Sequence, residues 1–176
     1  MNETLYVPYT RLGEATRVFL ASPLYTPCPV TLVDVSGNEG AYLAYLKAVW
    51  GRGESFINME HDIVPWPGAV KELLGCGHPW CFYGYDQGLD CAANGCAQFG
   101  LVRFKSAIIG ALPKVWEVYI DHHRYCHEHP WRGMDVHFFR YARERGHYPH
   151  QHHPAVFNAN PGILKNFGDH PVWVIE

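Results

Sequence analysis

Apolar and polar positions along the first sixty residues follow the periods of alternating strands and helices. Short runs rich in β-branched and aromatic residues predict strands, and apolar residues that recur every three or four positions predict the helices between them. The expected order is strand 4–10, helix 11–21, a buried strand 30–35, helix 41–51 and strand 54–60. This alternation predicts a parallel sheet with right-handed crossovers.

The second half of the chain has a less regular pattern. We expect a short helix at 67–75, a strand at 79–85, a loop at 86–98 and a second strand at 98–104. Helical material should follow over about 105–121, and a further helix over 132–146. The tail HYPHQHHPAVFNANPG is expected to be extended or looped. The chain has 176 residues, which suits one domain with a sizeable core.

Polar features fall where each of the first three predicted strands ends. They are Pro8 to Thr10, Asp34, and the charged group in FINMEHDIVPWPG, which comprises Glu60, His61 and Asp62. In parallel sheets, ligands bind beyond the carboxyl ends of the strands. We therefore expect these three features to converge on one edge of the sheet.

The two acids of this charged group suit a divalent cation. Because strand side chains alternate, we expect Glu60 and Asp62 to face the same way and His61 the opposite way. Two carboxylates at a strand end can hold Mn²⁺ or Mg²⁺, and the cation can bind a diphosphate. The alternative is a surface turn with hydrated acids. For Asp34 the alternative to a ribose or base contact is a helix cap or a turn cap, both of which this residue type makes readily.

Two further groups of titratable residues lie late in the chain. His147, His150, His152 and His153 can supply a metal ligand, or they can belong to a polar tail. Asp135 lies near the start of a predicted helix, where the helix dipole favours a carboxylate. It can also serve as a general base if that helix faces the cleft.

The charge and the cysteines narrow the class of protein. The formal net charge is −3, which disfavours a nucleic-acid binder that relies on broad phosphate neutralisation. The spacing of Cys76, Cys81, Cys91 and Cys96 resembles a four-thiolate zinc loop, although zinc pairs usually sit closer together. Free thiols are favoured over zinc. The chain shows no apolar run that would span a bilayer and no signal peptide, which predicts a cytoplasmic protein.

Taken together, these segments resemble small nucleotide-sugar-dependent glycosyltransferases of the GT-A type found in bacterial and phage genomes. The resemblance covers most of the chain and rests, in order, on YVPYTRL, LVDVSG, FINMEHDIVP, WCFYGY, QFGLVRFK, WRGMD and HQHHPAVFN. It implies an α/β fold, a GT-A-like three-layer sandwich with a mostly parallel, Rossmann-like sheet and helices on both faces. Within a single domain 1–176, residues 1–66 would bind the nucleotide and residues 67–176 the acceptor.

The resemblance also implies roles for matching positions. Pro8, Tyr9 and Thr10 would face the nucleotide, and Asp34 would contact its base or ribose. Glu60, His61 and Asp62 would stand in place of the family's D-x-D motif, with Asp62 as the expected metal ligand. Asp135 would be the catalytic base, and His153 or His152 the late metal ligand.

The implied cofactor is Mn²⁺ or Mg²⁺, and the implied donor is a nucleotide-diphosphate sugar, with a UDP-sugar first among the donors. Two departures from the family matter. The first acid of the motif is Glu60 and not Asp, so it can reach the nucleotide or a water in place of the metal. The chain is also short for this fold, so its acceptor-binding part must be minimal or supplied by a partner.

The resemblance leaves the acceptor unidentified and implies a glycan or a modified base in phage DNA, and the acidic net charge disfavours DNA. A phage-encoded protein would act in the host cytoplasm. Two other functions stay open at this point: a metal-dependent hydrolase of nucleotides or phosphoesters, and a non-enzymatic zinc-binding module.

Overall fold

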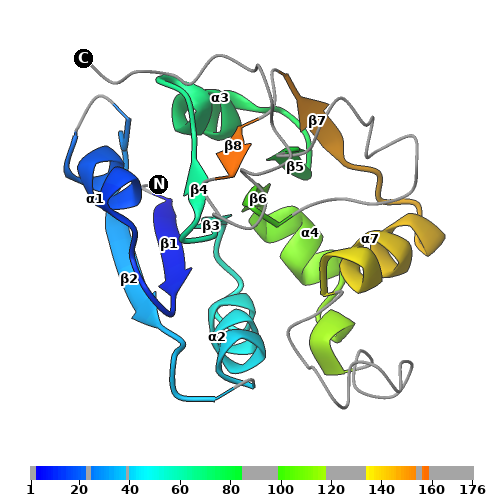
Figure 1. Cartoon of the computed structure of the whole chain (residues 1–176). Coiled ribbons are helices and arrows are strands. Elements are labelled where there is room, and N and C mark those ends of the chain that lie inside the picture. Colours follow the sequence, from blue (N-terminus) through cyan, green and yellow to red (C-terminus); the bar gives the residue numbers. More distant parts are fainter. Residues whose placement is uncertain are drawn as a thin grey trace.

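The computed structural model describes residues 3–22, 25–38, 40–84, 99–117, 134–153 and 156–158, and for Ala15, Phe157 and Asn158 it describes the backbone alone. Its centre is a six-stranded sheet with the strand order β2-β1-β3-β6-β5-β7 (Figure 1). In this order the strands are β2 (Val30–Asp34), β1 (Thr4–Tyr9), β3 (Phe56–Met59), β6 (Leu101–Phe104), β5 (Trp80–Tyr83) and β7 (His150–His152).

The first three strands are parallel, as the alternating pattern predicts. β1 pairs in parallel with both β2 and β3. β6 then runs antiparallel to β3 and to β5, and β7 runs parallel to β5. All strands of this sheet except β6 therefore point the same way, which makes the sheet mixed and mostly parallel.

Helices cover both faces of the sheet. Phe19 of α1 (Glu14–Ala21) and Leu73 of α3 (Ala69–Gly75) pack in one buried cluster with Leu5, Ile57 and Cys81 of the strands. The opposite face packs against α2 (Ala41–Trp50), α4 (Ser106–Ala111) and α7 (Met134–Glu144), where the second cluster is rich in aromatic rings. The prediction of an α/β fold with helices on both faces of a sheet is confirmed.

The central strands are buried on both sides because helices cover both faces. In β5, Trp80 and Phe82 join the aromatic cluster, whereas Cys81 and Tyr83 point to the α3 face. Every residue of β3, β5 and β6 is buried. Such fully buried, largely apolar strands are typical of the middle of an α/β sheet.

The expectation for residues 30–35 was partly wrong. The strand forms, but it is the edge strand β2 and not a buried one, and Leu32 in it is 48% exposed. The tail contains strand β7, which lies at the other edge of the sheet. A second, two-stranded sheet pairs β4 (Ile63–Val64) with β8 (Phe157–Asn158) antiparallel.

This small sheet brings the end of the described chain back toward the third strand. After β7, the Val156 amide donates a 2.9 Å hydrogen bond to the Gly84 carbonyl just beyond β5. Asn158 then pairs with Ile63, the residue that directly follows Asp62. The chain therefore returns from the edge strand β7 across the end of β5 to the turn that follows β3, as β8 shows in Figure 1. Among the described residues, no helix is long and apolar enough to cross a membrane.

Candidate functional site

The charged group Glu60, His61 and Asp62 lies in a turn that follows β3. β3 ends at Met59, and the Ile63 amide donates a 3.0 Å hydrogen bond back to the Glu60 carbonyl. The Glu60 amide is bound by the Gly100 carbonyl at 2.8 Å. The expectation that strand alternation orients these side chains was therefore wrong, because the strand stops before them.

The turn is also tied to the first helix. The hydroxyl of Thr16, a buried residue of α1, donates a 2.7 Å hydrogen bond to the His61 carbonyl. The backbone around the charged group is thus held from α1 and from Gly100. A turn fixed at both places can present its side chains at a constant position.

A neighbouring carboxyl group and one from a distant part of the sequence act on Glu60 here. Burial, together with the nearby charges of Asp62 and Asp135, raises the pKa of Glu60 to about 8. A weak hydrogen bond from Tyr42, with 3.5 Å between the hydroxyl and Oε1, opposes this rise. The sequence-predicted residues Glu60, Asp62 and Asp135 therefore share one electrostatic environment, which we call the acidic cluster.

Asp135 joins this cluster from the first turn of α7. Its Oδ1 accepts a 2.8 Å hydrogen bond from the Val136 amide, and burial raises its pKa above the ordinary value. A half-buried carboxyl whose pKa moves toward neutrality suits proton abstraction better than a fully hydrated one.

A network of hydrogen bonds around the buried Asn58 contacts the acidic cluster through Tyr42. Asn58 of β3 is fully buried, and its amide nitrogen donates to the Tyr42 hydroxyl and to the Phe99 carbonyl, both at 3.1 Å. Its Oδ1 accepts a 2.9 Å hydrogen bond from Tyr45. Sequence reasoning missed these residues, because the tyrosines fitted the apolar stripe of a helix. The available signal was the single amide inside the apolar run FINM.

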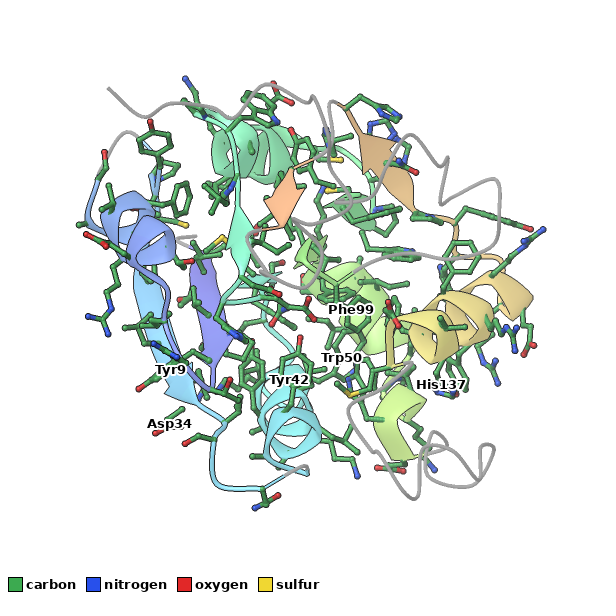
Figure 2. The ribbon with its side chains drawn as sticks, viewed as in Figure 1. Tyr9, Asp34, Tyr42, Trp50, Phe99 and His137 are labelled. Atoms are coloured by element: carbon green, nitrogen blue, oxygen red, sulfur yellow. The ribbon has the colours of Figure 1, made fainter. Side chains whose placement is uncertain are left out.

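Tyr9 and Asp34 lie side by side at the carboxyl ends of β1 and β2 (Figure 2). Their register is direct, and the Val35 amide donates a 2.9 Å hydrogen bond to the Tyr9 carbonyl. Pro8 is buried and Thr10 is exposed. Because β1, β2 and β3 are parallel, these residues and the acidic cluster all lie at the carboxyl ends of the strands, as expected.

The alternative interpretation of Asp34 as a turn cap is confirmed. Its Oδ1 accepts hydrogen bonds from the Ser36 amide at 2.9 Å and from the Ser36 hydroxyl at 2.6 Å. These hydrogen bonds lower the pKa of the exposed Asp34 carboxyl. The contact of Asp34 with a nucleotide stays a prediction.

The late histidines lie elsewhere on the sheet. His152 pairs with Tyr83 at the edge strand β7, three strand positions from β3, which is roughly 14 Å at the usual strand spacing. The structure groups His152 with Cys76 and Cys81 and does not bring it into the acidic cluster. His153 is exposed and begins the segment that leads back to β8. Metal binding by either histidine beside Asp62 stays a prediction.

The expected cysteine loop is described only in part. Cys76 and Cys81 are buried, Cys28 is half-buried, and none of the three forms a disulfide. Cys91, Cys96 and Cys126 lie outside the described residues.

A hollow of about 290 Å³ lies at the amino ends of strands β1 and β3. It is lined by the first residues of β1 and β3, Thr4 and Phe56, and by Arg52 and Ser106. This hollow is therefore at the amino ends of the parallel strands, away from the acidic cluster.

Comparisons with known proteins give information on the fold of this chain and none on its activity. No protein-family model matches the chain, and no curated protein sequence matches it. Among solved structures, the chain is similar to the one titled A197 from STIV, with a TM-score of 0.50 and 10% identity over 89% of this chain and 83% of that chain. It is also similar to a putative glucose-1-phosphate thymidylyltransferase from Bacillus anthracis in complex with a sucrose, with a TM-score of 0.46 and 11% identity over 93% of this chain and 73% of that chain. At such identities a likeness says nothing of activity, and the first of the two supports the mixed α/β fold.

Proposed function

We propose that this protein transfers a sugar from a nucleotide-diphosphate sugar to an acceptor, on a GT-A-like fold and with Mn²⁺ or Mg²⁺. The observation that carries the proposal is the acidic cluster at the carboxyl edge of three parallel strands, where the charges of Asp62 and Asp135 raise the pKa of Glu60. Ligands of open α/β sheets bind at this edge. The sequence resemblance supports the same assignment.

The chemistry of the acidic cluster fits a hard divalent cation. The negative charges of Asp62 and Asp135 repel a negative charge on Glu60, and a bound cation removes that repulsion. In the described part of the chain, these three acids do not form a group of ligand atoms within 4.8 Å of one another. Mg²⁺ is commonly held by one or two carboxylates together with waters and substrate phosphates. Asp62 and Glu60 are the proposed carboxylate ligands, and His153 is the proposed late ligand.

The bound cation would stabilise the negative charge that develops on the leaving diphosphate. Tyr9, Thr10 and Asp34 are proposed to contact the nucleotide, with residues 1–66 as the nucleotide-binding part and residues 67–176 as the acceptor-binding part. Asp135 is proposed as the base that takes a proton from the acceptor hydroxyl, because its carboxyl is half-buried and lies near Glu60.

The acceptor is proposed to be a glycan or a modified DNA base, and the net charge of −3 favours the glycan. A UDP-sugar is the first donor to test. Sugar transfer has to be distinguished from hydrolysis of the donor, in which water takes the place of the acceptor.

Ligand-dependent thermal stability tests the donor and the metal together. A ligand that binds the folded state alone raises the melting temperature by mass action. We expect one class of nucleotide-diphosphate sugar to raise it with Mn²⁺ present and to have little effect with a chelator. Asp62→Asn should abolish the metal-dependent part, whereas Glu144→Gln, which changes an exposed acid of α7, should retain it.

No shift with any nucleotide sugar would contradict the proposal. Metal-dependent release of free sugar, with no transfer to any of a panel of glycans and oligonucleotides, would assign hydrolysis. Either result is independent of the second metal site inferred below.

A further inference from the structure

Cys76, Cys81 and His152 place two thiols and an imidazole nitrogen within 4.8 Å of one another. In the described part of the chain, no other group of three or more such side chains lies this close together. We infer that these three residues bind Zn²⁺ at a site separate from the acidic cluster. The function of this zinc is to fasten the edge strand β7 and the end of α3 to β5.

The fold itself sets up this donor set. Cys81 and Tyr83 point to the α3 face of β5, and β7 adds His150 and His152 opposite them in parallel register. Residues that are paired in register share a face of the sheet. Cys76 follows α3 directly, and its amide bonds to the Leu73 carbonyl at 3.1 Å. The end of α3, the next strand β5 and the sequence-distant strand β7 thus deliver one ligand each.

The backbone of Cys76 is held in place without a metal. Arg103 of β6 donates hydrogen bonds to the carbonyls of Leu73 and Cys76 at 2.8 and 2.9 Å. Lys105 donates a 2.9 Å hydrogen bond to the next carbonyl, that of Gly77. Because both cations anchor the link between α3 and β5, the Cys76 thiol is kept beside the Cys81 thiol.

The two ring nitrogens of His152 have different surroundings. Its Nδ1 faces Oε2 of Glu72 at 3.8 Å, and the same oxygen accepts a 2.6 Å hydrogen bond from the Tyr83 hydroxyl. Its Nε2 is buried and has no hydrogen-bond partner among the described residues. A ligating histidine characteristically presents one nitrogen to a carboxylate and the other to the metal. A bound metal would thus satisfy the unpartnered nitrogen.

Zinc is the metal that best suits these donors. Two thiolates with one imidazole are soft and borderline ligands, which favour Zn²⁺ over Mg²⁺ or Mn²⁺. Two thiolates also balance the charge of the ion, and the nearby Arg103 is already paired with Glu3. Bonds of about 2.3 Å to sulfur in a tetrahedron require donor atoms roughly 3.7 Å apart. The present spacing of up to 4.8 Å is therefore within a short side-chain movement of this geometry.

Metal content after purification is the direct test. We expect about one zinc per chain in the wild type, and a loss of that zinc in Cys76→Ser, Cys81→Ser and His152→Gln. The matched controls are Cys28→Ser, a half-buried thiol, and His147→Gln, a half-buried histidine, and neither belongs to the three-residue group. The controls should keep their zinc. Retention of zinc by all three site variants would overturn the inference.

A spectroscopic measurement on the wild type covers the case in which a variant does not fold. X-ray absorption at the zinc edge should show two sulfur ligands at about 2.3 Å and at least one nitrogen at about 2.0 Å. A four-sulfur shell would assign the zinc to other cysteines. Metal-free protein with a disulfide between Cys76 and Cys81 would also overturn the inference, and mass spectrometry under non-reducing conditions detects it.

Stability separates this site from the acidic cluster. Zn²⁺ added to metal-free, reduced protein should raise the melting temperature by roughly 5 °C or more, and Cys81→Ser should remove this rise. Asp62→Asn should leave the zinc effect intact. Conversely, the Mn²⁺-dependent binding of a nucleotide sugar can fail while the zinc effect persists, so the two proposals fail independently.

Discussion

The Tyr42 hydroxyl lies 3.5 Å from Oε1 of Glu60 and accepts a 3.1 Å hydrogen bond from the Asn58 amide. Tyr42 therefore connects the acidic cluster with a fully buried side chain of the sheet. Burial keeps the pKa of Tyr42 well above its ordinary value, so the hydroxyl stays neutral and remains a donor to the carboxylate. The environment of Glu60 is thus fixed by α2 and β3 together.

Replacement of Tyr42 by Phe should raise the pKa of Glu60 above about 8, because the hydrogen bond that lowers it is lost. It should also lower the free energy of unfolding by about 1 kcal/mol, since Asn58 loses an acceptor. Carboxyl-carbon NMR titration measures the pKa. Tyr148→Phe, at an exposed ring, is the control and should change neither quantity. An unchanged Glu60 pKa in Tyr42→Phe would show that the hydroxyl does not act on the carboxyl.

Replacement of Asn58 by Leu should destabilise the protein more strongly. It removes the partners of the Tyr45 hydroxyl and the Phe99 carbonyl in a fully buried place, and each unsatisfied group costs roughly 1–3 kcal/mol. We expect a total loss of about 3 kcal/mol in urea unfolding. Thr31→Val on the exposed edge strand β2 should change the free energy of unfolding by less than about 0.5 kcal/mol. Equal effects of the two variants would contradict the network.

The contribution of Glu60 to the stability of the metal-free protein should fall as the pH rises from about 5 to about 8. The folded protein raises the pKa of Glu60 from the ordinary 4.5 to about 8, so it binds more protons than the unfolded chain in this interval. The stabilisation linked to protonated Glu60 is complete below the ordinary pKa and is lost as the pH approaches about 8. Glu60→Gln cannot ionise and should show a flatter profile of melting temperature against pH.

The control for this profile is Glu144→Gln, which removes an exposed acid. Its profile should follow that of the wild type. If Glu60→Gln also followed the wild type, Glu60 would titrate in the folded protein as it does in the unfolded chain.

The sequence predicted where helices and strands lie along the chain better than it predicted which elements pack beside one another. The periods of residues 4–60 located the first five elements, and their alternation predicted the parallel pairing of β1, β2 and β3. The burial of β2 was not predictable, because VTLVDV has the composition of a central strand and nothing local states that it lies at the edge. The turn at Glu60 was also hidden, since its amide is bound by Gly100 from a distant segment.

The residue types of the site could be predicted from the sequence, but their arrangement in space could be predicted only in part. Glu60 and Asp62 are neighbours in sequence, whereas Asp135 reaches them only because α7 packs on the same face of the sheet as α2. The grouping of His152 with Cys76 and Cys81 depends on β7 pairing with β5, and a strand of three residues carries too little pattern to reveal its partner. Asn58 was the missed signal, because a lone amide in an apolar strand needs buried partners.

Replacement of Arg103 by Lys should destabilise the protein although the charge is kept. Arg103 is 6% exposed, pairs with Glu3 through its guanidinium, and binds two carbonyls of the α3 end with the remaining nitrogen. A lysine ammonium cannot reproduce this fork. We expect a loss of about 3 kcal/mol in urea unfolding, as for other broken buried ion pairs.

Arg140→Lys, at an exposed position of α7, is the matched control and should be close to neutral. A similarly small effect of Arg103→Lys would show that a single ammonium satisfies Glu3 and both carbonyls.

Replacement of Phe138 by Ala should both destabilise the protein and disturb the acidic cluster. Phe138 is fully buried, and its ring packs 5.0 Å from those of Trp80 and Phe104, measured between centroids. Loss of such a ring costs about 3–5 kcal/mol because a cavity remains. Phe138 lies one helical turn after Asp135, so a loosened α7 should weaken the effect of Asp135 on Glu60 and lower the pKa of Glu60, as NMR titration would show. Val18→Ala on the exposed side of α1 is the control, and a comparable loss of stability in both variants would mean that α7 is not anchored by Phe138.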